Sequence, residues 1–139
     1  SQGFITNGLV FTSGQIPVNP ANGEVPEGIT AQTEQSCKNV AAILEAAGSG
    51  MDKVVKTTCF LADIADFAAF NEVYAKYFIS KPARSCFAVW RKGRYRERAG
   101  LGARKASLAQ VGTRKVERTN LPGMLPQHCR TNDIRENPA

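Results

Sequence analysis

The sequence predicts an α+β domain of two layers, a mixed sheet that carries two helices on one face. Three observations predict it. The chain has 139 residues, about the length of one domain. Hydrophobic residues make up 42% of it and charged residues 22%, proportions typical of a chain that folds around an apolar core. Strand-like and helix-like segments follow one another in the order ββ, α, β, α, β.

The first two strands are predicted over residues 3–6 and 9–13. They flank Asn7-Gly8, a pair that favours a type I′ turn because both residues tolerate positive φ. Side-chain alternation places Ser13 on the same face as other odd-numbered residues of its strand. Residues 15–28 contain three prolines and two glycines, which interrupt regular structure and predict a loop.

The first helix is predicted over about residues 31–47, because apolar residues recur there at steps of three and four. Thr30 is the expected N-cap, and Gly48 is the residue expected just beyond the end. Residues 54–61 are rich in β-branched side chains and predict a mostly buried strand.

The second helix is predicted to begin after Asp63 or Asp66, either of which suits an N-cap. Its apolar positions form one stripe: Phe67, Phe70, Tyr74, Tyr77 and Phe78. A fourth strand is predicted over residues 84–89. Alternation places Arg84 and Cys86 on one face of that strand.

The chain changes character after Val89. Residues 1–89 carry a net charge of −2 and residues 90–139 a net charge of +8, and all seven phenylalanines lie in the first part. We therefore predict a folded domain over 1–89 and a basic, divergent tail over 90–139 that is partly disordered. Within the tail, residues 106–111 are the best candidate for a further strand.

Composition excludes several classes of protein. No run approaches the ~18 apolar residues that a membrane span needs, so we predict no membrane association. Four cysteines without a Cys-x-x-Cys pair, together with one histidine, do not make a metal site, and no phosphate-binding glycine loop is present. We expect free thiols in a reducing compartment, the cytoplasm or, as the alternative, the mitochondrion.

Arg84 is the first candidate for a functional residue. It lies within an apolar strand, where burying an unpaired cation is costly, so its guanidinium should bind a carboxylate. That carboxylate belongs either to a ligand or to the protein, as an ion pair with one of three acids: Asp63, Asp66 or Glu72. Both interpretations stay open from the sequence.

Four further residues are candidates. Cys86 shares the face of Arg84, although a small buried cysteine is the ordinary interpretation. Ser13 and Gly14 end a strand and offer a hydroxyl and an approachable backbone amide. Asn71 is polar within the aromatic stripe, where solvation on a helix surface is the ordinary explanation.

Four blocks of sequence extend this interpretation. In chain order they are LVFTSGQIPVNP from Leu9, QSCKNVAAILEAAG from Gln35, VVKTTCFLAD from Val54 and PARSC from Pro82. Together they resemble the Rid family of reactive intermediate deaminases, also called YjgF or L-PSP proteins. The resemblance covers about residues 1–89, and the order of the blocks makes it highly specific.

The resemblance implies a chorismate-mutase-like (YjgF-type) protomer, a homotrimer with clefts between subunits, and no cofactor or metal. The implied reaction hydrolyses enamines and imines, such as 2-aminoacrylate and 2-iminopropanoate, to 2-keto acids and ammonia. By motif, Arg84 and Cys86 would be the catalytic residues, the first binding the substrate carboxylate and the second offering its backbone. Ser13, Gly14 and Asn71 would shape the substrate site.

Two family features have no counterpart here: a Gly-Pro-Tyr segment before the position of Ser1, and a strand bearing a glutamate linked to water activation after the fourth strand. Glu97 follows Lys92-Gly93 at a similar spacing, but arginines flank it, so we interpret the match as accidental. We expect the last family strand to be missing or replaced and the activity to be impaired. A shifted reading frame, a retained intron or a chimeric sequence would explain the change.

Two alternatives to a deaminase follow from the same residues. The basic tail suggests an RNA-binding or endoribonuclease-type translation inhibitor, with weak support because Tyr95 is the one aromatic residue within its charge run. An inactive scaffold is the other alternative.

Overall fold

The computed structural model describes residues 1–89, 106–114 and 134–136. Its strands within these residues are β1 (Gly3–Thr6), β2 (Leu9–Thr12), β3 (Val54–Leu61), β4 (Ala83–Ala88), β5 (Ala106–Arg114) and β6 (Ile134–Glu136). They form one sheet in the order β4-β3-β5-β2-β1-β6. Because β3 pairs in parallel with β4 but antiparallel with β5, the sheet is mixed, as predicted.

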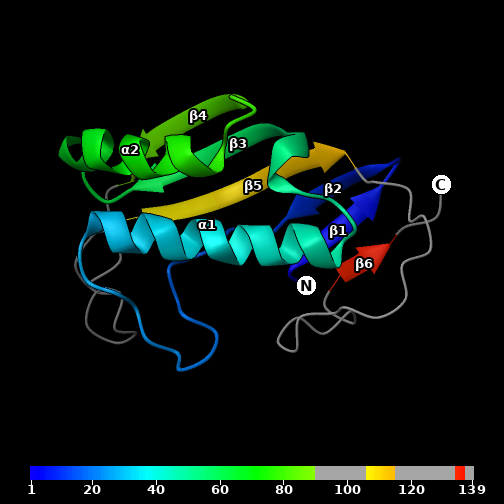
Figure 1. The fold of residues 1–139 in the computed structure, drawn as a ribbon, viewed down its shortest axis with the longest axis horizontal. Coiled ribbons are helices and arrows are strands. Elements are labelled where there is room, and N and C mark those ends of the chain that lie inside the picture. The colour runs from blue at the N-terminus through cyan, green and yellow to red at the C-terminus, as the bar shows by residue number, and fades with distance from the viewer. Residues whose placement is uncertain (90–105, 115–133, 137–139) are drawn as a thin grey trace.

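The helices are α1 (Ile29–Ala46) and α2 (Phe67–Tyr77), with short 3-10 helices η1 (Met51–Lys53) and η2 (Ile64–Asp66) before β3 and α2. Figure 1 shows α1 and α2 side by side on one face of the sheet. The predicted two-layer α+β fold is therefore confirmed. Within the described residues, no helix has both the length and the apolar character to cross a bilayer.

The first hairpin forms as predicted. β1 and β2 pair antiparallel with Thr6 opposite Leu9, and the two residues between them have positive φ, 48° at Asn7 and 72° at Gly8. Those values are typical of a type I′ turn, whose twist matches that of the flanking strands.

The start of α1 differs from the prediction, and its end agrees with it. Gly28, with φ 79°, is the N-cap, and Thr30 lies inside the first turn, so the predicted Thr30 cap is wrong. A glycine adopts this positive φ without strain and lets the loop turn into the helix. At the other end, Gly48 has φ 73° and the Ser49 N–H donates to the Leu44 carbonyl at 2.8 Å, a Schellman-type ending.

The segment between β3 and α2 decides between the two predicted caps. The Asp63 side chain accepts a hydrogen bond from the Ala65 N–H at 2.9 Å and so caps η2. Asp66 precedes α2 but makes no capping hydrogen bond. The chain thus enters α2 through one turn of 3-10 helix.

A segment of the basic tail supplies a central strand. β5 pairs antiparallel with β3, where Cys59 lies opposite Leu108, and with β2, where Val10 lies opposite Thr113. The strand predicted over 106–111 is confirmed, and the last family strand is replaced rather than missing. Glu97 and Cys129 lie outside the described residues, as do the parts of the tail that we expect to be disordered. The domain boundary at Val89 stays a prediction.

The core lies between the sheet and the two helices. Its fully buried members include Val10, Cys37, Val40, Leu44, Cys59, Leu61, Phe70 and Phe78. The other face of the sheet keeps large rings exposed: Phe4 is 38% exposed, Phe11 37% and Phe87 53%. Phe4 and Phe11 lie directly opposite each other on β1 and β2. Such an apolar face is typical of a surface that contacts another molecule.

Candidate active site

Arg84 lies on β4, at one edge of the sheet. The Val89 N–H donates to the Leu61 carbonyl at 2.8 Å, and Phe87 lies opposite Phe60. In a parallel ladder with this register, the backbone groups of residues 85, 87 and 89 turn toward β3. Those of Arg84 and Cys86 therefore face away from β3, toward the edge of the sheet, where no described strand pairs with β4.

The guanidinium of Arg84 contacts three residues of α2. Its Nη1 donates a hydrogen bond to Asn71 Oδ1 at 2.7 Å. Its Cζ lies 4.6 Å from the ring centroid of Tyr74 and 5.3 Å from that of Phe67. Residues 67, 71 and 74 share one face of the helix because they are four and three positions apart. The helix thus offers the cation one amide oxygen and two ring faces.

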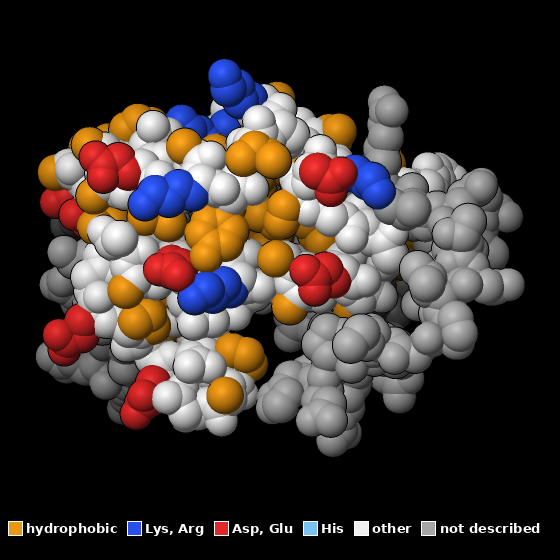
Figure 2. Space-filling view, in the orientation of Figure 1, with side chains coloured by type: hydrophobic (Ala, Val, Ile, Leu, Met, Phe, Trp, Pro, Cys, Tyr) orange, Lys and Arg blue, Asp and Glu red, His pale blue; other side chains and the backbone are white. Residues whose placement is uncertain are grey.

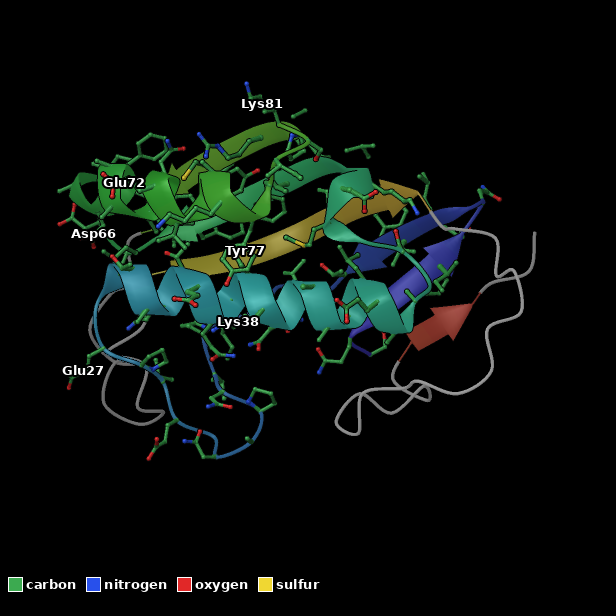
Figure 3. The ribbon with its side chains drawn as sticks, in the orientation of Figure 1. Glu27, Lys38, Asp66, Glu72, Tyr77 and Lys81 are labelled. Carbon is green, nitrogen blue, oxygen red and sulfur yellow. The ribbon has the colours of Figure 1, made fainter. Side chains whose placement is uncertain are left out.

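The described contacts of Arg84 favour a ligand carboxylate over a structural ion pair. Its hydrogen-bond acceptor among them is the amide oxygen of Asn71, and the ion pair described joins Lys38 to Glu34. Glu72 projects from the exposed side of α2 (Figure 3). An arginine has five N–H donors, and Asn71 accepts from one nitrogen. Among the described contacts, most donors of the guanidinium therefore remain for a ligand.

Cys86 lies on the face of Arg84, half-buried and packed against the core. It is directly opposite Cys59 on β3. Burial raises the pKa of the Cys86 thiol, although the charge of Arg84 opposes this effect. A protonated thiol is a weak nucleophile, so the backbone of Cys86, at the open edge of β4, is the part suited to a ligand.

Ser13 and Gly14 lie elsewhere. The Ser13 N–H donates to the Gln2 carbonyl at 2.8 Å, continuing the hairpin, and its Oγ donates to the Ser1 carbonyl at 2.6 Å. Ser13 is exposed while Thr12 is buried, so its side chain lies on the face away from the helices. β2 and β4 are three strand spacings apart, about 14 Å. One chain therefore brings Arg84, Cys86 and Asn71 together but not these two.

The chain was compared with known proteins. A sequence model of the family described as endoribonuclease L-PSP matches residues 1–92. This chain belongs to the L-PSP family. The resemblance to Rid, YjgF or L-PSP proteins is therefore confirmed, and it ends where the composition of the chain changes.

Relatives in this family include named enzymes. A 2-iminobutanoate/2-iminopropanoate deaminase of Escherichia coli K12 is 49% identical over 94 residues, which cover 65% of this chain and 73% of the enzyme. Protein HMF1 of Saccharomyces cerevisiae is 53% identical over 90 residues, 64% of this chain and 70% of HMF1. The crystal structure of E. coli TdcF with bound serine has a TM-score of 0.71 and 36% identity, over 83% of this chain and 87% of TdcF.

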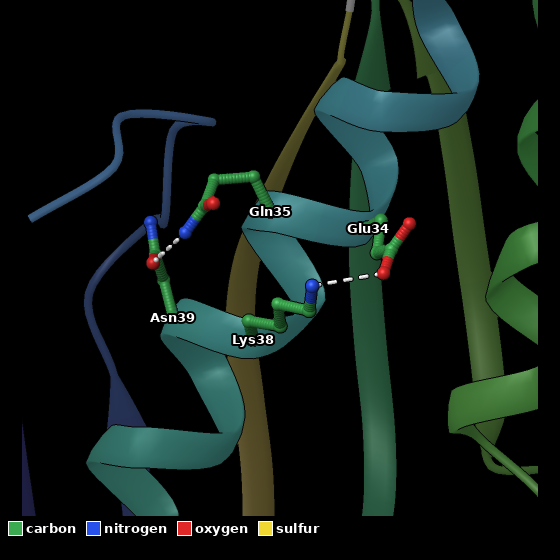
Figure 4. A network of polar contacts seen from close by, with 4 residues as sticks. All are labelled: Glu34, Gln35, Lys38 and Asn39. Atoms are coloured by element: carbon green, nitrogen blue, oxygen red, sulfur yellow. Dashed lines mark hydrogen bonds and ion pairs between the residues drawn. The ribbon is translucent and has the colours of Figure 1, made fainter. Parts of the chain in front are cut away.

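In this L-PSP chain, α1 holds the loop that follows Gly14. Asn39 Nδ2 donates to the carbonyls of Ile16 at 3.0 Å and Val18 at 2.9 Å. Gln35 Nε2 in turn donates to Asn39 Oδ1 at 2.8 Å (Figure 4). A loop with several prolines is thereby fixed to a helix, which positions the backbone just after the hairpin.

Two aromatic residues beside Arg84 were not predicted as part of the site. Phe67 and Tyr74 were predicted to belong to the core stripe, but both rings also lie against the guanidinium. A signal was present: an asparagine separates the two aromatics at helical spacing, and a lone arginine follows in the next strand. A stripe that includes a polar residue favours a site as well as a core.

Proposed function

We propose that this chain is a deaminase that hydrolyses enamines and imines of small 2-carboxylates to 2-keto acids and ammonia. The observation that carries the proposal is the Arg84 guanidinium, which α2 holds on the edge strand β4 by an amide oxygen and two ring faces, with no carboxylate among its described contacts. Identity of 49% with a 2-iminobutanoate/2-iminopropanoate deaminase supports the reaction. The serine bound to TdcF supports a small carboxylate as the ligand.

The proposed substrate contacts use hydrogen-bond donors of Arg84, Cys86 and Asn71. The planar fork of Arg84 suits two hydrogen bonds to one carboxylate, and the Cys86 N–H is at the same edge. Because Asn71 Oδ1 accepts from Arg84, its Nδ2 is the end that turns to other partners. We assign this amide nitrogen to the substrate site as a donor.

The reaction adds one water and breaks one bond. An enamine first gains a proton on carbon and loses one from nitrogen, which gives the imine. Water then attacks the imine carbon, a C–O bond forms, and the nitrogen takes up protons while the oxygen loses them. The C–N bond breaks and ammonia leaves, so the carbonyl oxygen of the keto acid comes from water. The Arg84 charge, by binding the carboxylate, holds the imine carbon at a constant place for this attack.

The complete site is proposed to lie between copies of the chain, in a homotrimer. Ser13 and Gly14 are too far from Arg84 to join it within one chain, and Ser13 lies on the face away from the helices. That face also exposes Phe4, Phe11 and Phe87, which a neighbouring copy would cover. One copy would then provide Arg84 and the next copy Ser13 and Gly14.

The free thiols of Cys37, Cys59 and Cys86 support a reducing compartment, the cytoplasm or the mitochondrion. Because β5 replaces the strand that bears the family glutamate, we also propose that turnover is lower than in the E. coli deaminase.

The test is the release of ammonia and pyruvate from 2-aminoacrylate, which a serine dehydratase generates in the assay. The full chain should speed the release, and Arg84→Ala should lower kcat/KM by about 10- to 100-fold, the usual worth of a charged hydrogen bond. Lys76→Ala, which removes an exposed cation from α2, is the matched control. Equal activity of the wild type and Arg84→Ala would reject the carboxylate assignment, and no activity in either would favour the inactive scaffold.

RNA cleavage is the second candidate, because the family description names an endoribonuclease. The described part of the helix-covered face carries charges of both signs among apolar side chains (Figure 2), which is not typical of a nucleic-acid surface. Residues 90–139 hold the basic charge. Salt-dependent RNA binding by the full chain that disappears when Arg91, Lys92 and Arg94, which lie outside β5, are replaced by alanine would support the RNA candidate.

A further inference from the structure

We infer that Tyr74 is a positioning residue for Arg84: its ring face supports the guanidinium, and its bond to Thr57 fixes the ring and thus the plane of the fork. The inference rests on the proposed function, in which Arg84 binds the substrate carboxylate. It adds a residue of α2 and a residue of β3 to the machinery of that site.

Three contacts close a triangle around the guanidinium. Thr57 lies directly opposite Arg84 in the parallel pairing of β3 with β4. The Thr57 Oγ1 and the Tyr74 phenol oxygen are 2.7 Å apart and hydrogen-bonded. The Tyr74 ring centroid is 4.6 Å from Arg84 Cζ. Residues of both β3 and α2 therefore fix the position of the Arg84 guanidinium.

Aromatic support suits a ligand-binding arginine for a chemical reason. A ring face attracts a cation through its quadrupole and accepts none of its in-plane N–H donors. A protein carboxylate would instead take up two donors and neutralise the charge. Tyr74 and Phe67 thus stabilise the half-buried cation while its fork stays free to bind an incoming carboxylate.

The Tyr74 ring is itself held in place. It stacks on Phe78 with centroids 4.3 Å apart and an interplanar angle of 22°, and Phe70 lies 5.7 Å away on the same helix. Tyr74 is 6% exposed and Thr57 is fully buried. Burial raises the pKa of the Tyr74 phenol, so the hydroxyl stays neutral and keeps its bond to Thr57 at neutral pH.

A purely structural Tyr74 would behave differently from a positioning one. If Tyr74 only filled the core, its replacement would lower stability without a specific effect on carboxylate binding. Val73 offers the matched control, because it is buried beside Tyr74 in the sequence and makes no contact with Arg84 among those described.

The first experiment measures the binding of pyruvate to the full chain by calorimetry, together with the melting temperature. Tyr74→Leu should weaken pyruvate binding about tenfold. Tyr74→Phe keeps the ring but loses the bond to Thr57, and should weaken pyruvate binding about threefold. Thr57→Val should weaken it by the same factor, and adding Thr57→Val to Tyr74→Phe should change little more, because the bond is already gone. Val73→Ala should lower the melting temperature and leave the pyruvate Kd unchanged.

The second experiment uses free guanidinium ion as a probe in the Arg84→Ala background. The ion should restore pyruvate binding to Arg84→Ala, because the slot beside Tyr74 remains, and fail to restore it to Arg84→Ala with Tyr74→Leu. Equal weakening by Tyr74→Leu and Val73→Ala, or equal restoration in both backgrounds, would overturn the inference. If Arg84→Ala weakens binding and Tyr74→Leu does not, only the positioning role is wrong; if neither weakens it, the carboxylate assignment is wrong as well.

Discussion

The α2–β4 region and the β1–β2 hairpin contain the two groups of predicted site residues, and the two groups differ in burial and in their contacts. In the first region, Arg84 and Asn71 meet at 2.7 Å on a buried aromatic support. In the second, Ser13 is exposed, and its described hydrogen bonds join it to the backbone of residues 1 and 2 and to the side chain of Gln15. One group is assembled by the fold of a single chain, and the other lies apart from it in that chain.

The difference follows from sheet order. β3 and β4 are neighbours, and α2, which connects them, packs over their helix-covered face. The hairpin lies beyond β5, and Ser13 lies on the opposite face of the sheet. A substrate site that uses both groups therefore needs a second copy of the chain, which is the feature that the predictions below address.

The largest expected effect comes from mixing two inactive variants. Arg84→Ala removes one group, and Ser13→Trp blocks the other. If each site is shared by neighbouring copies of a trimer, coexpressed variants purified through two different tags should regain about a third of wild-type activity, because every mixed trimer restores one of its three sites. Deamination assays on the mixed oligomer would measure this. No recovery would mean that both groups act within one chain.

Replacing a phenylalanine by alanine should lower the free energy of unfolding more in the α2–β4 region than in the hairpin. Phe70, on α2, is fully buried, whereas Phe11 on the hairpin is 37% exposed. Phe70→Ala should cost about 3–5 kcal/mol in the free energy of unfolding, and Phe11→Ala clearly less. Urea denaturation compares the two. Equal costs would contradict the placement of the core on the α2 side.

Alkaline pH should lower the stability of the fold through the buried thiols of Cys37 and Cys59. Burial raises the pKa of Cys37 and of Cys59 to about 12, from the ordinary 9.0. Between these values the unfolded chain has lost protons that the folded chain keeps, so stability is complete below pH 9 and falls as pH rises toward 12. Each thiol should contribute a slope of about 1.4 kcal/mol per pH unit. Cys59→Ala should flatten the slope in urea titrations, and an unchanged slope would contradict the burial.

The smallest expected effect belongs to the hairpin turn. Gly8 has φ 72° and open space where a Cβ would stand, so Gly8→Ala adds backbone strain alone, about 1 kcal/mol. Gly8→Asn should cost less, because asparagine tolerates this conformation. Thermal unfolding of both variants gives the comparison. A pyruvate affinity unchanged in Gly8→Ala would also show that Arg84 is insulated from the hairpin.

Much of the fold could be predicted from the sequence, because local signals were strong. Asn7-Gly8 predicted the hairpin, and the β-branched run at 54–61 predicted β3, since turn chemistry and strand periodicity act over a few residues. The Thr30 cap was wrong because a glycine two positions earlier, already at positive φ, began the helix first. The candidate residues were found by their chemical type and by family resemblance, but their grouping was not.

By itself, then, the sequence determined the elements, the candidate residues and the family, because side-chain periodicity and short motifs are local properties. Only the tertiary structure decided which partner Arg84 has and which face Ser13 occupies. The positive charge of an arginine in an apolar strand needs a partner that offsets the cost of burial. An amide oxygen, a ring face or a carboxylate can each be that partner. The choice among them depends on the register of β3 with β4 and on the helix packed above, which join residues far apart in the chain.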